Sequence, residues 1–313
     1  MLDRERPAEI RRNMPNPSIT IALPARKSVA TIASTLSSIQ RQTFEDFELI
    51  VADDGSSDDT VEIARQFDDP RFRIISDGKS LGLPRRLNQL ASLARGEFFA
   101  RMDADDVMHP RRLELQHAAL VSDPALDVVG TDAYAIDNDD HVVGVFKSAS
   151  PSSNPWTVAN EGAFIHPTVM GRTAWFQRNP YAEWAHRAED LELWTRTCAT
   201  SKFAVIHRPL LFYRLRDARD FQPAFASARM AGRIILTEGA RIGAPWRARR
   251  SVAGRHARLL AYALYCCTGA RSFAWKFRRL RSRLSAGGSS ELMMAQHALD
   301  ELLGPGEIRR TCR

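Results

Sequence analysis

The stretch "EFFARMDADD", residues 97–106, places three carboxylates within four positions directly after an apolar pair. Phe98 and Phe99 predict a buried strand, so "DADD" (103–106) lies at its carboxyl end. Like charges at this spacing repel one another, and burial strengthens the repulsion. Two arrangements would relieve it: a solvated turn that caps the following helix, or a bound cation. The apolar strand before the carboxylates favours the cation.

The residues around this stretch alternate between strand-like and helix-like segments. Four such pairs in a row predict an α/β fold with a doubly wound, Rossmann-like and mostly parallel sheet flanked by helices. Ligands bind such sheets beyond the carboxyl ends of the strands. Apolar runs predict strands over 18–25, 47–55, 71–76 and 97–106, and helical spacing or capping signals predict helices over 28–42, 56–67, 83–95 and 110–122.

The pattern changes after residue 123, where strands follow one another without a helix between each pair. The sequence predicts three parts: an N-terminal arm (1–16), an α/β domain (17–220) with halves 17–125 and 126–220, and a basic, mainly helical extension (221–313). Within the second half we expect a hairpin over 126–137 and 141–146, a strand over 163–172, a helix over 188–200 and a strand pair over 203–216 broken at Pro209.

The charge is distributed unevenly along the chain. The net charge is +7, but residues 201–313 hold 22 basic and 7 acidic side chains. Such a tail predicts an anionic partner. In "RSFAWKFRRLRSRL" (271–284) the apolar residues share one helical face and arginines occupy most of the rest. Either the segment lies on an anionic membrane surface, or it packs its apolar face on the protein. We expect no nucleic-acid partner, because no binding module is recognisable.

Cysteine usage and hydropathy point to a cytoplasmic protein. The four cysteines show no paired metal-binding spacing, which predicts reduced thiols. The first residues lack the apolar region of a signal peptide, and no run reaches the ~18–20 apolar residues of a membrane span. A peripheral position on the inner face of the membrane stays open as an alternative.

Three acidic pairs are the candidate functional residues. Asp53-Asp54 follows the second strand and would either form a turn or contact a nucleotide. Asp103 and Asp105 could converge on Mg²⁺ or Mn²⁺, which would bridge them to a diphosphate. Glu189-Asp190 opens a helix, where it would either stabilise the helix start or serve as a general base. Spacing alone does not choose between these alternatives.

In combination, these segments resemble the family 2 glycosyltransferases of the GT-A fold. The matching stretches, within roughly 17–215, are "SITIALPARKSVATIASTLSSIQRQTFEDFELIVADDGSSDDT", "RFRIISDGKSLGLPRRLNQLASLARGEFFARMDADDVMHPRRLELQ", "HPTVMGR" and "AEDLELWTR". The resemblance implies an inverting, metal-dependent transfer of a sugar from a nucleotide-diphosphate sugar, with UDP-sugars favoured. The acceptor would be a hydroxyl group of a glycan, a lipid-linked sugar or another molecule, in bacterial polysaccharide or cell-envelope synthesis.

The resemblance also implies roles for residues on the nucleotide side. Pro24 and Ala25 would lie beside the base and ribose. Asp53 would accept a hydrogen bond from the base, and Asp54 would lie near it. Asp103 would contact the donor or the metal.

Further roles concern the metal and the acceptor. Asp105 would be the direct ligand of Mn²⁺ or Mg²⁺, and Asp190 would be the catalytic base, with Glu189 beside it. Many relatives have a histidine shortly after the "YR" pair at the end of the domain, but this chain does not. We therefore expect Arg214 or Arg216 to hold the diphosphate instead.

Two other functions remain as alternatives. A sugar nucleotidyltransferase would normally carry a glycine-rich loop after the first strand, whereas "LPARKSVA" (23–30) contains no glycine. A non-catalytic protein of the same fold could use its basic tail to dock on a membrane or a partner. The intact acidic residues Asp103, Asp105 and Asp190 argue against it.

Overall fold

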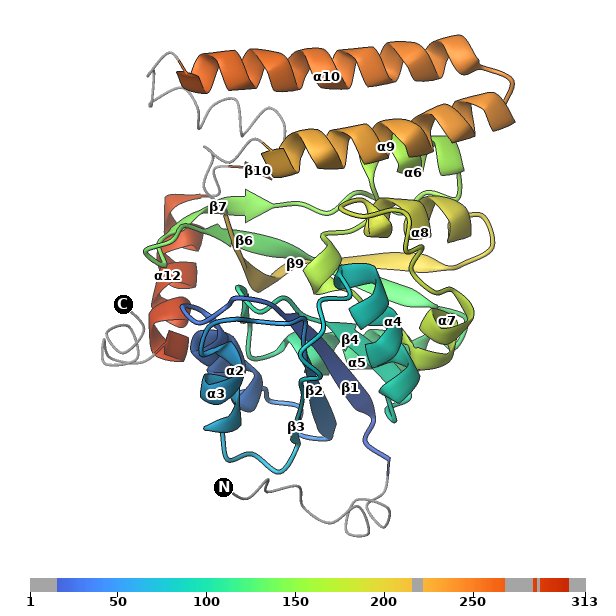
Figure 1. The fold of residues 1–313 in the computed structure, drawn as a ribbon. Helices are drawn as coiled ribbons and strands as arrows, with labels where there is room; N and C mark the ends of the chain where they lie inside the picture. The colour runs from blue at the N-terminus through green and yellow to red at the C-terminus, as the bar shows by residue number, and fades with distance from the viewer. Residues whose placement is uncertain (1–15, 216–221, 268–283, 286–287, 304–313) are drawn as a thin grey trace.

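The computed structural model describes residues 16–215, 222–267, 284–285 and 288–303, which form an α/β fold around one mixed sheet (Figure 1). The strand order is β10-β7-β6-β8-β4-β1-β2-β3, and β9 adds to this path by pairing with β6 and with β5. The predicted arm 1–16 and the predicted membrane segment 271–284 lie almost entirely outside the described residues. The predicted domain boundaries remain predictions.

The first half of the sheet is parallel, as predicted. β1 pairs with β2 on one side and with β4 on the other, and β3 follows β2 at the edge. The strands are β1 (Ile19–Ala25), β2 (Phe47–Asp53), β3 (Phe72–Ile75) and β4 (Phe98–Arg101), and the helices between and after them are α2 (Ile32–Gln40), α3 (Thr60–Arg65), α4 (Leu83–Leu93) and α5 (Arg112–Ser122).

Helices cover both faces of this half because successive side chains of a strand point to opposite faces. Ile21 of β1 packs in the same core cluster as Leu36 of α2. Its neighbour Ala22 belongs instead to the cluster with Leu87 of α4. The apolar runs that predicted these strands are therefore buried on both sides, as expected for a parallel sheet.

The second half of the sheet is mainly antiparallel. β6 and β7 form the predicted hairpin, β8 lies between β6 and β4 and runs antiparallel to both, and β9 runs parallel to β6. The strands are β6 (Val128–Ile136), β7 (Val142–Phe146), β8 (Met170–Arg172) and β9 (Phe203–Arg214). The sheet is thus mixed, because β8 runs antiparallel to β4 and β6, while β9 pairs in parallel with β6.

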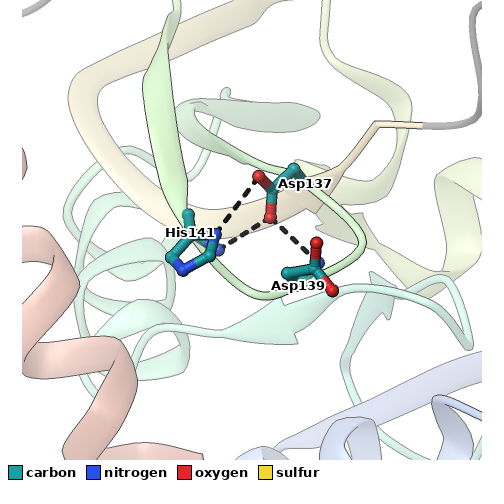
Figure 2. Close-up of side chains that lie close together, drawn as sticks. All are labelled: Asp137, Asp139 and His141. Carbon is teal, nitrogen blue, oxygen red and sulfur yellow. Dashed lines mark hydrogen bonds and ion pairs between the residues drawn. The ribbon is translucent and has the colours of Figure 1, made fainter.

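The turn between β6 and β7 is closed by a side chain. Asp137 Oδ1 accepts hydrogen bonds from the backbone N–H groups of Asp139 and His141, each at 2.9 Å (Figure 2). Such bonds let an aspartate replace the hydrogen bonds that a turn leaves open. We call Asp137, Asp139 and His141 the turn cluster.

Three sequence-based predictions of strands need correction. The strand predicted over 163–172 covers only β8, because His166–Thr168 form a 3-10 helix, η1, around Pro167, which has no N–H to donate to a ladder. The strand pair predicted over 203–216 is the single strand β9, and Pro209 lies at a shift in register against β6. The fourth strand ends at Arg101, so the carboxylates of "DADD" lie in the loop beyond it.

The described C-terminal helices pack on two sides of the sheet domain (Figure 1). α9 and α10 fold back on each other, and α12 packs against α2 and β7, where the Arg41 guanidinium donates to the carbonyl oxygens of Glu301 and Leu302. None of the described helices is long and apolar enough to cross a membrane. The remaining elements are β5 (Val107–Met108), α6 (Pro155–Glu161), α7 (Thr173–Arg178), α8 (Glu189–Thr197), α9 (Gln222–Arg241), α10 (Pro245–Cys267), β10 (Leu284–Ser285) and α12 (Ser289–Leu303).

Candidate active site

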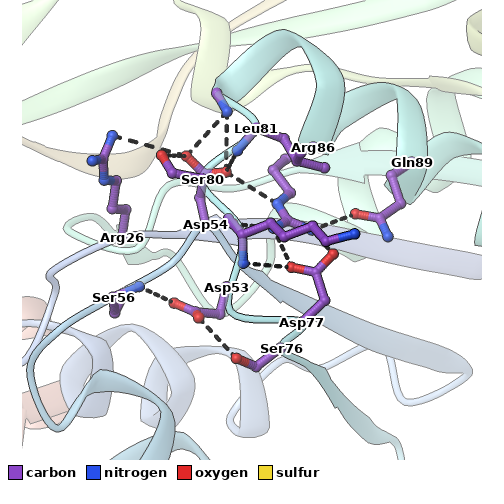
Figure 3. Close-up of polar contacts among 12 residues, drawn as sticks. Arg26, Asp53, Asp54, Ser56, Ser76, Asp77, Ser80, Leu81, Arg86 and Gln89 are labelled. Atoms are coloured by element: carbon purple, nitrogen blue, oxygen red, sulfur yellow. Dashed lines mark hydrogen bonds and ion pairs between the residues drawn. The ribbon is translucent and has the colours of Figure 1, made fainter.

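Asp53 is held at the carboxyl end of β2, beside the end of β1. Its carboxylate accepts hydrogen bonds from the backbone N–H of Ser56 at 3.1 Å and from Ser76 Oγ at 2.9 Å (Figure 3). Ala25, the last residue of β1, accepts at its carbonyl oxygen from the Asp54 N–H at 2.8 Å. The predicted nucleotide residues Pro24, Ala25 and Asp53 therefore meet at one edge of the sheet, where Ala25 and Asp53 are buried and Pro24 is half-buried.

Asp54 organises the loop that leads into α4. Its Oδ1 accepts from the N–H groups of Leu81 at 2.6 Å and Gly82 at 3.0 Å, and from Arg86 Nε at 3.1 Å (Figure 3). Gly82 has φ +86°, a left-handed conformation that favours glycine. The Arg86 side chain is fully buried and also pairs with Asp77, so that its hydrogen bonds lower the pKa of Asp77 to about 2. Asp54 thus shapes the wall of the predicted nucleotide site.

Three carboxylates converge in the loop after β4. One oxygen each from Asp103, Asp105 and Asp106 lies within 4.8 Å of the others, and we call these residues the β4 cluster. Asp106 is only 1% exposed. Its Oδ1 accepts from the Arg214 N–H at 2.8 Å, and its buried Oδ2 has no hydrogen-bond partner among the described residues. Burial, followed by the charges of the other two carboxylates, raises the pKa of Asp106 well above its usual range.

None of the three carboxylates caps α5, although the sequence had left that arrangement open, and Asp106 is buried rather than solvated. The residue that caps α5 is Arg111, five positions beyond Asp106. A buried carboxylate oxygen without a partner carries a large desolvation cost that a cation would remove. Carboxylate oxygens are also the ligands that Mn²⁺ and Mg²⁺ prefer. The β4 cluster therefore fits a hard divalent cation.

Arg101, which sequence reasoning missed, lies beneath the β4 cluster. It is the last residue of β4 and is 2% exposed, with Nη2 placed 2.5 Å from Asp103 Oδ1. Its Nε and Nη1 have no hydrogen-bond partner among the described residues. Burial opposes its charge, but Asp103, Asp106 and Glu189 together raise the pKa of Arg101 above its ordinary value. The sequence signal that could have identified Arg101 was a charged residue in the otherwise apolar strand β4.

A second buried arginine, Arg112, holds the end of β4 in place. The Arg112 side chain is fully buried and donates from Nη2 to the Arg101 carbonyl oxygen at 2.8 Å and from Nε to Gln116 Oε1 at 2.9 Å. Burial, followed by the charge of Arg101, lowers the pKa of Arg112 to about 9. The end of β4 is thus fixed from the protein interior.

Glu189 and Asp190 open α8, and both interact electrostatically with Arg101. Burial, followed by the charge of Asp190, raises the pKa of Glu189 to about 7, and Glu189 Oε2 is buried without a partner among the described residues. Burial also raises the pKa of Asp190, while the charge of Arg101 opposes this shift. The charge of Asp103 acts on Asp190 as well. The two predicted acidic sites, far apart in sequence, therefore share one electrostatic environment centred on Arg101.

His166 completes the buried surroundings of Arg101. Its Nε2 lies 3.0 Å from the Tyr181 hydroxyl oxygen. Burial, followed by the charge of Arg101, lowers the pKa of His166 well below its usual value, so the ring is neutral. This arrangement suits a structural histidine.

Arg214 ties the two acidic clusters together. Its guanidinium donates from Nε to the Asp105 carbonyl oxygen at 2.9 Å, from Nη1 to the Asp137 carbonyl oxygen at 2.9 Å and from Nη2 to Asp140 Oδ1 at 2.6 Å. These bonds hold the loop of the β4 cluster against the turn between β6 and β7. A contact from Arg214 to a diphosphate remains a prediction, and Arg216 lies outside the described residues.

Comparison with known proteins identifies the class of this protein. The family model described as Glycosyl transferase family 2 matches residues 20–211, more than half of the chain. The protein therefore belongs to glycosyltransferase family 2 and is a glycosyltransferase. The fold agrees, because a mannosyltransferase from Pyrobaculum calidifontis solved with GDP-Man and Mn²⁺ superposes with TM-score 0.57 at 15% identity, over 92% of this chain and 86% of that one. S. aureus TarS 1–349 in complex with UDP gives TM-score 0.55 at 18% identity, over 93% and 82%.

Two curated relatives show how similar the sequence is to those of known proteins. The chain is 31% identical over 186 residues to the putative glycosyltransferase EpsE of Bacillus subtilis, covering 58% of this chain and 66% of that protein. It is 27% identical over 189 residues to WfgD of Escherichia coli, covering 60% and 73%. WfgD is described as a UDP-Glc:alpha-D-GlcNAc-diphosphoundecaprenol beta-1,3-glucosyltransferase. The chain thus spans about two thirds of the length of such relatives.

Proposed function

We propose that this chain is an inverting, metal-dependent glycosyltransferase that moves a sugar from a UDP-sugar to a hydroxyl group during bacterial polysaccharide or cell-envelope glycan synthesis. The observation that carries the proposal is the meeting of the β4 cluster and the Glu189-Asp190 pair around the buried Arg101. Buried carboxylates with raised pKa values are costly to keep, and they concentrate at functional sites.

In this proposal the nucleotide lies at the ends of β1 and β2. Pro24 and Ala25 line the base and ribose, Asp53 accepts from the base, and Asp54 keeps the adjoining loop in place. Support for a uridine nucleotide comes from the relatives: WfgD is named for UDP-Glc, and TarS was solved with UDP-GlcNAc. The mannosyltransferase neighbour was solved with GDP-Man, so the base is a point to test.

The donor diphosphate meets the β4 cluster. Asp105 and Asp103 would hold Mn²⁺ or Mg²⁺, with Asp106 as a further oxygen donor in the same cluster. When bound, the cation neutralises charge that develops on the leaving diphosphate. Arg101 holds the Asp103 carboxylate in place at the base of the site, and Arg214 fixes the loop that carries Asp105.

Asp190 is the proposed general base. It takes the proton of the acceptor hydroxyl, whose oxygen then forms a bond to the anomeric carbon while the bond from that carbon to the diphosphate oxygen breaks. The nucleoside diphosphate leaves with the bonding electron pair. One such displacement inverts the configuration, and it needs no nucleophile from the protein. Glu189 lies beside Asp190, and the charge of Asp190 contributes to the raised pKa of Glu189.

The acceptor we favour is a lipid-linked sugar, because the name of WfgD specifies a diphosphoundecaprenol-linked acceptor. A cytoplasmic protein peripheral to the inner face of the membrane would meet such a molecule, and this location remains part of the proposal. A sugar nucleotidyltransferase or a non-catalytic scaffold is less well supported, because neither explains why Glu189 and Asp190 share the electrostatic environment of Arg101 with the β4 cluster.

A panel of nucleotide sugars tests the proposal, with product analysis at fixed Mn²⁺. We expect a UDP-sugar to raise the unfolding temperature only when Mn²⁺ is present, and we expect UDP to be released on transfer. Release of pyrophosphate would instead identify a nucleotidyltransferase. Absence of both binding and turnover with every nucleotide sugar would leave the non-catalytic alternative.

A further inference from the structure

α10 is held to the rest of the protein along one side. Ser251 Oγ donates to Asn160 Oδ1 at 2.5 Å, and Arg255 donates to the Asn160 carbonyl oxygen at 3.1 Å. Ala248 is buried against α9, where a Cβ added at Gly239 would come within 2.3 Å of the Ala248 Cβ. The two helices therefore approach too closely at this point to accept a larger residue than glycine. In Figure 1, α10 is the outermost element, with α9 between it and the sheet.

The opposite side of α10 is open and apolar along its centre. Trp246 is 65% exposed and Leu260 54% exposed, and Ala253 and Ala257 between them are exposed too. At 3.6 residues per turn these four positions fall within about 60° of the helix circumference. We call this stripe, with the exposed Arg249 and Arg250 at its sides, the α10 outer face.

The charge of the α10 outer face has one sign. The sequence contains no Asp or Glu between Glu238 and Glu291. A lone exposed tryptophan would need no explanation, but an apolar stripe bordered by arginines is the pattern of a helix that lies in a membrane interface. The stripe enters the boundary between headgroups and acyl chains, while long arginine side chains reach the phosphates.

Other occupants fit this surface less well. A second copy of the chain, docked by the same face around a two-fold axis, would bring arginines against arginines. A nucleic acid would use the arginines but would leave Trp246 and Leu260 without an apolar partner. We propose that the α10 outer face docks on the anionic surface of a lipid bilayer.

Docking through α10 would bring the acceptor side of the active site close to the membrane surface. Ile234 and Ile235 of α9, Ala248 of α10 and Ala188, the residue before α8, form one buried cluster. The helix that begins with Glu189-Asp190 is therefore packed directly against the hairpin of α9 and α10. This link to a lipid-linked acceptor rests on the proposed function, whereas the docking itself does not.

Vesicle flotation of the full-length chain tests the docking. We expect binding to vesicles of phosphatidylcholine with phosphatidylglycerol, little binding to phosphatidylcholine alone, and loss of binding as salt rises. The double variant Trp246→Glu/Leu260→Glu should weaken binding at least about tenfold, and Arg249→Gln/Arg250→Gln should do so by a similar factor. The matched control is Met293→Glu/Met294→Glu on α12, where two methionines are 73% and 65% exposed. This control should bind as the wild type does.

Unchanged binding of both α10 variants would overturn the proposal, and so would equal binding to neutral and anionic vesicles. A wild-type dimer that Trp246→Glu/Leu260→Glu dissociates would identify a second copy as the occupant instead. Circular dichroism and donor hydrolysis without vesicles should not change in these variants, because the residues lie away from the proposed catalytic groups. Vesicle binding without any nucleotide-sugar turnover would contradict the proposed function and leave the docking intact.

Discussion

The β4 cluster and the turn cluster look alike by distance alone, since each brings three ligand-type atoms within 4.8 Å of one another. Their surroundings differ. In the turn cluster, Asp139 and His141 are exposed, and Asp137 uses one oxygen to accept the N–H groups of its own turn (Figure 2). In the β4 cluster, Asp106 is buried, and one of its oxygens has no partner among the described residues.

The difference in burial and hydrogen bonding distinguishes a candidate metal site from a self-contained turn. The charges of the turn cluster are screened by solvent and satisfied by local hydrogen bonds, so the cluster needs no ligand to be stable. The carboxylates of the β4 cluster lie close together despite their mutual repulsion. They lie at the end of a buried strand, next to the buried guanidinium of Arg101. Proximity of carboxylates is therefore weak evidence for a metal site, and burial without hydrogen-bond partners is stronger evidence.

The largest effect should come from Asp190, the proposed general base. Asp190→Asn keeps the shape of the side chain but removes its capacity to take a proton, so we expect kcat to fall about 10²–10⁴-fold. Donor binding measured by calorimetry should change little. Glu192→Gln is the matched control on the same helix, where Glu192 pairs with Arg196. A kcat for Asp190→Asn equal to that of Glu192→Gln would exclude Asp190 as the base.

The basic side chains beside the two clusters, Arg101 and His141, should differ in their effect on stability. Arg101→Met leaves Asp103 and its neighbours without their buried partner, so we expect the free energy of unfolding to fall by roughly 3–5 kcal/mol. His141→Gln changes the exposed partner of Asp137 and should leave the denaturation midpoint unchanged. Urea unfolding of both variants makes the comparison. Equal, small losses would show that the two clusters are equivalent surface features.

The pH dependence of stability should report Glu189. The folded chain raises the pKa of this group from its ordinary 4.5 to about 7, so it binds the proton more tightly than the unfolded chain does. The stabilising contribution is complete below pH 4.5 and is lost as the pH rises to about 7. Glu189→Gln should therefore flatten the stability curve in this window and stabilise the fold at pH 8 by roughly 1–3 kcal/mol. If the slope of unfolding free energy against pH between about pH 5 and about pH 7 is the same in Glu189→Gln as in the wild type, Glu189 titrates normally.

The smallest effect is expected in the turn cluster itself. Asp139→Asn removes a charge from an exposed turn without removing the hydrogen bonds that Asp137 makes, so kcat/KM at saturating Mn²⁺ should stay within about twofold of the wild-type value. Steady-state assays at several Mn²⁺ concentrations check this. A marked increase in the Mn²⁺ requirement of Asp139→Asn would make the turn cluster part of the metal site.

Sequence reasoning succeeded where the signal was local. The apolar runs of β1, β2 and β4 fixed the parallel half, and the acidic residues after β2 and β4 predicted which edge of the sheet to examine. The antiparallel half was harder, because β8 and β9 are defined by partners far away in the sequence, and Pro209 is accommodated by a shift in register. Arg101 was missed because its importance comes from Glu189, which only the fold brings near it.

The most direct test of the account is calorimetric titration of a UDP-sugar in the presence and absence of Mn²⁺. We compare the wild type with Asp105→Asn and with Asp139→Asn, which remove one carboxylate from each cluster. The account predicts Mn²⁺-dependent binding that Asp105→Asn abolishes and Asp139→Asn retains. Mn²⁺-dependent binding that survives Asp105→Asn but is lost in Asp139→Asn would contradict it.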